Sequence, residues 1–220
     1  MKRVGILLAA ALSSLCGMGC ADGNDSWFAQ SVQEDGREFM ALKGLEPDSN
    51  SPTIKSVNVL PKSVKTNRAE YQIEMREPQK QTRNRFGHVE SHGFYAKSAG
   101  GVIASGSLTV YPDAISACEV ACGLEMQYYS IPAKAVARSY CDVCNGGVAV
   151  LMRQGLPGMR RDAGMCSLIF RNVTIRMHSQ GKEVEDSELR DIAMALLRLC
   201  CPECEGEPQP LDRINRIDRI

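Results

Sequence analysis

The chain has 220 residues, and its 26 Lys and Arg residues balance its 26 Asp and Glu residues, so its formal net charge at pH 7 is zero. This balance excludes the strongly basic surface typical of a nucleic-acid-binding protein and the polybasic patch of a protein that binds anionic membranes. The length is sufficient for one ordinary domain with additional segments at its ends. Aromatic residues make up only 5% of the chain, so covalent cross-links would help a core that buries little aromatic surface.

The first part of the chain, residues 1–21, has the layout of a secretory signal peptide. Lys2 and Arg3 supply the basic start, an apolar run follows over residues 4–15, and small residues end at Ala21. We therefore predict cleavage after Ala21 and an extracytoplasmic protein. The apolar run is shorter than the stretch of about 20 residues that a membrane-spanning helix needs. We expect no transmembrane segment once the signal has been removed.

A second interpretation of the same region is a bacterial lipobox. Gly19 directly precedes Cys20, as a small residue does in that motif, but Gly17 stands where the motif has leucine. This resemblance implies an envelope lipoprotein anchored through Cys20. We keep it as the alternative to simple cleavage.

The next segment, residues 22–53, is polar and has weak periodicity. Its end, residues 46–52, combines Pro47 and Pro52 with Asp, Ser and Asn, a composition typical of a loop. We predict a flexible lead or pro-segment over residues 22–53 that packs little against the rest of the chain.

An ordered, cysteine-rich domain is predicted over residues 54–205. Alternating apolar and polar side chains at residues 69–76 predict a half-buried strand. Further strands are expected at residues 56–60, 93–97, 102–111, 135–144, 147–152 and 169–178. An Asn-Gly pair at residues 145–146 favours a tight hairpin turn, because both positions of that turn require positive φ.

Two segments of this domain have helical periodicity. One helix is expected to begin at Asp113 and to run for about three turns, and another follows residues 183–187 and ends before Pro202. The predicted fold class is therefore α+β, a small antiparallel sheet with two short helices, cross-linked by disulfides. The tail, residues 206–220, repeats with a period of three that matches neither helix nor strand, so we predict low-complexity sequence there.

The cysteines are concentrated in the second half of the chain. None lies between residues 22 and 117, and an even number follows, which predicts disulfides in an exported chain. The candidates are Cys118, Cys122, Cys141, Cys144, Cys166, Cys200, Cys201 and Cys204. They allow on the order of a hundred pairings, and the sequence does not choose among them.

Structural zinc is the alternative to disulfides. Residues 141–146 and 201–206 both have the pattern CxxCxG, which resembles the knuckles of zinc ribbons and of the DnaJ cysteine-rich module. The resemblance covers only these two hexapeptides. It implies one zinc ion held by Cys141, Cys144, Cys201 and Cys204.

The remaining chemical groups form no known motif. His88 and His92 lie between glycines, so a loop is expected in place of a helix that would let them share a metal. His178 ends a predicted strand and is the histidine that a hydrolase would use if a serine and a carboxylate lay beside it. Asn24 and Asn172 begin glycosylation sequons, which matter only in a eukaryotic secretory pathway.

These patterns predict a secreted or cell-envelope binding protein that is cysteine-rich and has no catalytic residues, with the general layout of effector or toxin-like proteins. The expected partner is an extracellular or envelope protein or ligand, with no nucleic acid and, except under the zinc hypothesis, no cofactor. Arg160 and Arg161 are expected in an ordinary basic loop, and cleavage by a dibasic protease is the alternative.

Overall fold

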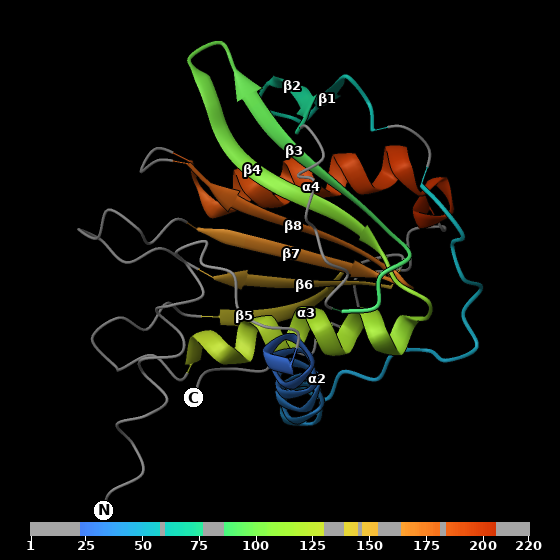
Figure 1. Cartoon of the computed structure of the whole chain (residues 1–220). Coiled ribbons are helices and arrows are strands. Elements are labelled where there is room, and N and C mark those ends of the chain that lie inside the picture. Colours follow the sequence, from blue (N-terminus) through green and yellow to red (C-terminus); the bar gives the residue numbers. More distant parts are fainter. Residues whose placement is uncertain are drawn as a thin grey trace, which may run out of the picture.

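A computed structural model describes residues 23–57, 60–76, 86–129, 139–144, 147–153, 164–180 and 184–205. Their main feature is an eight-stranded antiparallel sheet with helices on both faces (Figure 1). The predicted α+β class is confirmed, but the sheet is larger than expected, and the described residues form three α-helices instead of two. The predicted signal peptide, Cys20, the 145–146 turn, Arg160, Arg161 and the tail lie outside the described residues.

The strand order of the sheet is β1-β2-β3-β4-β8-β7-β6-β5. The strands are β1 (Ser63–Lys65), β2 (Glu70–Met75), β3 (Glu90–Ser98), β4 (Gly101–Val110), β5 (Ser139–Cys144), β6 (Val148–Arg153), β7 (Met165–Phe170) and β8 (Val173–Ser179). After β4 the chain passes through a helix to the far edge of the sheet, and β5 to β8 then return strand by strand until β8 pairs with β4.

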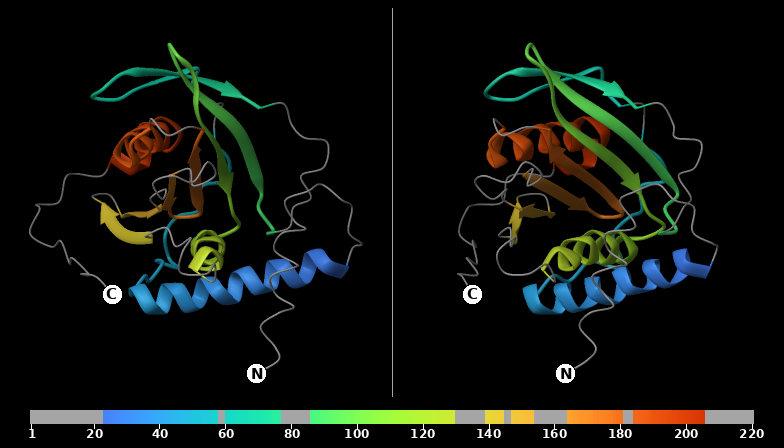
Figure 2. Two further views of the ribbon diagram at one scale, coloured as in Figure 1. Left: turned by 90° about the vertical axis from the view of Figure 1, so that its left-hand side faces the viewer. Right: turned by 60° about the vertical axis from the view of Figure 1, so that its left-hand side comes forward.

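The helices lie in separate layers around this sheet. They are α2 (Gly23–Lys43), α3 (Ala114–Tyr129) and α4 (Asp186–Cys200), followed by the short 3-10 helix η2 (Pro202–Glu205). One face of the sheet, here called the inner face, packs against α4, and the other, the outer face, packs against α3. In the left view of Figure 2, α3 is seen nearly end-on between the sheet and α2, which runs across the view.

Two hydrophobic cores follow from this layering. The larger core joins the inner face to α4, whose predicted apolar stripe of Leu189, Ile192 and Leu196 is fully buried as expected. The smaller core joins the outer face of β6 and β7 to α3 and α2. All six residues of β7 are buried, because this strand is covered on both faces.

Helix α2 occupies a segment that the sequence predicted to be a flexible lead. Val32 and Phe39 on this helix are fully buried in the smaller core. An ideal Cβ at Gly36 would lie 1.9 Å from a backbone oxygen of α3, and one at Gly123 would lie 1.7 Å from the Val32 carbonyl oxygen. The two helix backbones therefore touch at glycines, a form of packing that needs no wide apolar stripe and leaves little periodic signal in the sequence.

The predicted strand at residues 169–178 is interrupted by a turn. Arg171 has a φ of 52°, in the left-handed region, and the chain reverses there from β7 to β8. The apolar alternation continues through this turn because both strands bury side chains, so the pattern alone did not mark the reversal.

Candidate functional site

The disulfide cross-links predicted from the sequence are not supported by the structure, in which all eight described cysteines are free thiols. The sulfurs of Cys118 and Cys122 are in contact at 3.8 Å, well beyond the length of about 2 Å for a disulfide bond. These two residues are four apart on α3, and helical geometry brings their sulfurs into contact but not into the spacing of an unstrained disulfide.

The first CxxC motif is divided between the two faces of the sheet. It lies in β5, where Cys141 pairs with Leu151 of the smaller core and Cys144 pairs with Val148 of the larger core. Side chains three residues apart in a strand point to opposite faces. Cys144 accordingly lies 2.9 Å from a guanidinium nitrogen of Arg190 on α4, while Cys141 packs beside α3.

The second CxxC motif forms the end of α4. The backbone N–H of Cys201 donates to the Leu197 carbonyl at 2.7 Å, and that of Cys204 donates to the Cys201 carbonyl at 2.9 Å. Burial raises the pKa of the Cys200 thiol to about 11 and that of Cys201 to about 12. Such thiols are protonated at neutral pH and are poor nucleophiles.

The structure therefore does not bring the four proposed zinc ligands, Cys141, Cys144, Cys201 and Cys204, together as one tetrahedral site. Within the ranges it describes, no group of three or more His, Cys, Asp or Glu side chains could hold a metal ion. Cys166, the remaining cysteine, is fully buried in β7, where burial raises the pKa of its thiol.

A buried ion pair joins α3 to the outer face of the sheet. Glu125 has no exposed surface, and its carboxylate lies 4.0 Å from Arg176 of β8 and accepts a hydrogen bond from the Ser167 hydroxyl at 3.5 Å. The Arg176 Nε also contacts the sulfur of Met165 at 3.1 Å. The sequence analysis did not single out this pair, although a carboxylate within an apolar helix and an arginine within a largely apolar strand can signal a buried ion pair.

The outer face becomes polar beyond the area that packs against α3. Two rows of side chains cross it from strand to strand. One row holds Glu74, Tyr95, Ser105 and His178, and the next holds Ser107 and, at the border with α3, Arg176. We call these residues, together with Arg76, the outer polar surface. They come from the consecutive strands β2, β3 and β4, from the residue that follows β2, and from β8, which is distant in sequence but adjacent to β4 in the sheet (Figure 1).

Arg76 and Tyr95 contact one another on the outer polar surface. The Arg76 guanidinium lies 5.4 Å from the centre of the Tyr95 ring, within the range of a cation–π contact. A Cβ at Gly93 would lie 3.3 Å from the Arg76 side chain, so the absence of a side chain there leaves room for the arginine to lie flat. Beside them, Lys97 pairs with Glu74.

The three histidines have different surroundings. His178 lies opposite Ser105 of β4, whose hydroxyl accepts a hydrogen bond from Gln180 at 2.6 Å. His92 lies in β3, not in the predicted loop, and contacts Glu90. Burial lowers the pKa of His88. His88 lies before β3, which begins at Glu90, so the two histidines do not share a helix on which they could hold a metal together.

Asn172 has a structural role that the glycosylation sequon did not reveal. Its side-chain nitrogen donates to the carbonyls of Ile54 and Tyr111 at 2.8 and 2.7 Å, and its oxygen accepts from the Ile54 N–H at 2.8 Å. Only 1% of the residue is exposed. A glycan on this nitrogen would disrupt these bonds, so the buried amide does not fit the glycosylation proposed from the sequence. Asn24 is in α2, and its side chain is outside the described part.

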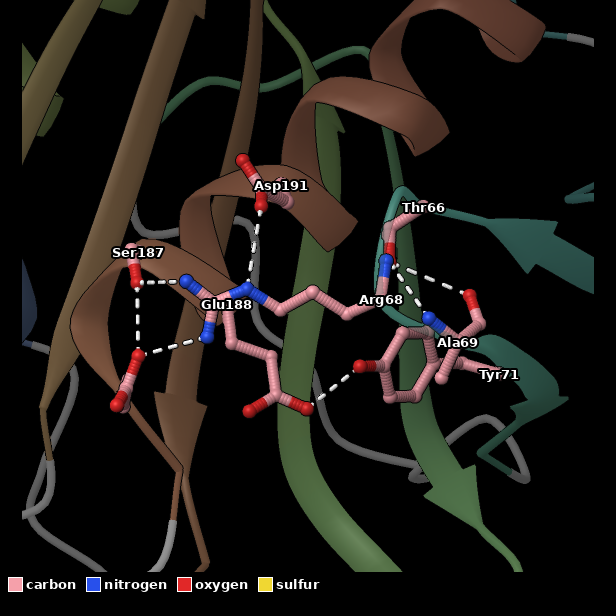
Figure 3. Close-up of polar contacts among 8 residues, drawn as sticks. Thr66, Arg68, Ala69, Tyr71, Ser187, Glu188 and Asp191 are labelled. Atoms are coloured by element: carbon pink, nitrogen blue, oxygen red, sulfur yellow. Dashed lines mark hydrogen bonds and ion pairs between the residues drawn. The ribbon is translucent and has the colours of Figure 1, made fainter.

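A second polar cluster fastens the β1–β2 hairpin to α4 (Figure 3). The Arg68 guanidinium donates to Glu185 at 2.7 Å and to the Ser187 hydroxyl at 2.8 Å. The Tyr71 hydroxyl donates to Glu188 at 2.5 Å, and burial together with this carboxylate raises the pKa of Tyr71 to about 12. The cluster holds the edge of the sheet over α4 and is explained by the fold alone.

Comparison with known proteins gives no family. No protein-family model and no curated protein sequence matches the chain. Among solved structures, the extracellular domain of PknH from Mycobacterium tuberculosis is similar with a TM-score of 0.36 and 10% sequence identity, over 74% of this chain and 90% of that chain. Among the described helices, none combines the length and the apolar character needed to cross a bilayer.

Proposed function

We propose that the chain is an exported binding protein without catalytic activity and that it engages an extracellular or envelope partner through the outer polar surface. The observation that carries this proposal is the stacked pair of Arg76 and Tyr95, held on paired strands. Arginine and tyrosine are enriched among the residues that contribute most to binding energy in protein interfaces.

The neighbouring side chains support a binding role. Glu74 and Lys97 place a negative and a positive charge beside Arg76 and Tyr95. Such charges favour a partner whose surface carries the opposite charge at each position. Ser105 and Ser107 add hydroxyl groups on the next strand, and each can donate or accept a hydrogen bond. Because strand pairing fixes the backbone under all of them, little ordering entropy is lost when a partner binds.

The proposed export depends on the N-terminal pattern of Lys2, Arg3 and the apolar run that follows. The test is the intact mass of protein recovered from outside the cytoplasm of its native host. A mature chain that begins at Asp22 supports cleavage after Ala21. A chain that begins at a lipid-modified Cys20 supports the envelope-lipoprotein alternative. Full-length protein confined to the cytoplasm refutes export.

The binding role can be tested by cross-linking in the native host. Wild type and the Tyr95→Ala variant are treated with a cross-linker on intact cells, and the cross-linked partners are quantified by mass spectrometry. We expect one partner to be enriched with wild type and reduced at least about tenfold with Tyr95→Ala, as for the loss of an interface residue worth about 1.4 kcal/mol. The control is Leu42→Ala, which removes an exposed side chain on the distant helix α2. Equal recovery with both variants would show that the outer polar surface is not the binding site.

A further inference from the structure

Three of the eight thiols lie together in the smaller core. Cys118 and Cys122 come from successive turns of α3, and Cys141 comes from β5 on the same face of the sheet. Cys122 has no exposed surface and Cys118 is 4% exposed. Helix α2 belongs to the same core and packs against α3.

The members of this group differ in reactivity. The 3.8 Å contact allows the Cys122 thiol to hydrogen-bond to the Cys118 sulfur, which lowers the pKa of Cys118 and raises that of Cys122. Burial raises the pKa of Cys141 to about 12. Cys118 is therefore the thiol that most readily becomes the nucleophilic thiolate, and Cys122 is the thiol in contact with it.

We propose that Cys118 and Cys122 are a reversible redox pair that forms a disulfide within α3 when the protein meets a low-molecular-weight disulfide such as oxidised glutathione. The Cys118 thiolate attacks one sulfur of the oxidant, whose S–S bond breaks and releases one glutathione thiol. Cys122 then attacks the mixed disulfide and releases the second. One S–S bond forms in the protein, and the two thiol protons and two electrons leave with two reduced glutathione molecules.

Helical geometry makes this bond easy to reduce. Cβ atoms four residues apart on a helix are about 5–6 Å apart, whereas a relaxed disulfide needs about 3.5–4.5 Å. Strained disulfides have more oxidising potentials and are the labile ones. Since both thiols are buried, oxidation also requires a local opening of the structure. The inference does not depend on the proposed binding role, because it concerns the purified chain alone.

The tryptic peptides of this chain distinguish the possible bonds. Residues 98–134 form one tryptic peptide that contains both Cys118 and Cys122, and residues 139–153 form another that contains Cys141 and Cys144. After folded protein is incubated with oxidised glutathione and free thiols are alkylated, we expect peptide 98–134 to be lighter by two hydrogen atoms and to carry no alkyl group. Excess reduced glutathione should restore both thiols.

Two variants complete the experiment. Cys141→Ser, a matched change in the same thiol group, should leave the bond intact, whereas Cys122→Ser should abolish it. A cross-link between the two peptides, or two alkylated cysteines in peptide 98–134 of wild type after oxidation, would overturn the proposal. Both outcomes are measured on wild type, so a variant that fails to fold does not affect them.

Discussion

Substitution of Gly123 by alanine tests the close contact between α2 and α3. The added Cβ would lie 1.7 Å from the Val32 carbonyl oxygen, 2.7 Å from the carbonyl carbon and 3.0 Å from a side-chain carbon of the same residue. Two of these atoms belong to the backbone of α2 and cannot move by a rotamer change. Helix α2 must therefore shift as a unit or separate from α3.

The expected change in the free energy of unfolding is the difference between a stabilising effect on the helix and a destabilising effect on its packing. Replacing Gly by Ala in a helix interior stabilises the helix by up to about 1 kcal/mol. Forcing a methyl group into a well-packed core costs about 1–3 kcal/mol, and complete separation of α2 would also expose Phe39, whose burial is worth about 1.5–3 kcal/mol. We expect a net loss of about 1–3 kcal/mol in the free energy of unfolding.

Urea denaturation with two probes measures this loss and locates it. Trp27, the single tryptophan, lies on α2 and is 57% exposed, so its fluorescence reports on α2, whereas far-ultraviolet circular dichroism reports on the whole fold. In Gly123→Ala we expect the fluorescence transition to move to lower urea concentration and to precede the dichroism transition. Gly100→Ala is the control, because the nearest atom to its new Cβ is a serine hydroxyl at 3.8 Å. If Gly123→Ala were as stable as wild type with coincident transitions, the packing of α2 described above would be wrong.

Three further predictions concern polar contacts. Asn172→Ala removes three hydrogen bonds and leaves the partly buried backbone groups of Ile54 and the buried carbonyl of Tyr111 without this partner, so we expect a loss of about 2–3 kcal/mol in the free energy of unfolding, measured by urea denaturation. An unchanged midpoint would contradict the buried role of this amide. Arg176→Ala leaves the Glu125 carboxylate buried without its arginine, and a loss of about 3–5 kcal/mol is expected, which Glu125→Gln in the same chain should partly restore. The guanidinium of Arg68 lowers the pKa of Glu185. The stabilisation from this pair is therefore present above the unfolded pKa of about 4.3 and is lost as the pH falls through the lower, folded value. The thermal midpoints of wild type and Arg68→Ala should accordingly differ at neutral pH and converge in acid, and a constant difference at every pH would refute the assignment.

Local periodicity predicted several elements of the sheet and its helices. The alternation of Tyr71 and Ile73 with polar residues corresponds to the buried and exposed positions of β2, and the apolar stripe of α4 is buried as predicted. The turn at residues 98–101 joins β3 to β4. These elements were predictable because each one repeats its own pattern over neighbouring residues, and that pattern depends only on the geometry of a helix or a strand.

Local periodicity failed to predict two features of the fold, the turn between β7 and β8 and the helix α2. The alternation on both sides of Arg171 concealed the turn between β7 and β8, and α2 packs through Gly36 and Gly123 with only a few buried apolar side chains. A glycine in a predicted loop and a glycine at a helix crossing are identical in sequence. The difference lies in the partner helix, which is distant in the chain.

The sequence by itself determined the class of the fold, the balanced charge and the presence of many cysteines. Tertiary structure alone decided where those cysteines lie: the alternation of β5 separates Cys141 from Cys144, and the crossing of α3 over the sheet brings Cys141 to Cys118 and Cys122. It also decided that Arg76 and Tyr95 stack on one surface. The physical reason is that strand order and helix packing set distances between residues far apart in the chain, whereas sequence patterns report only on the backbone near each residue.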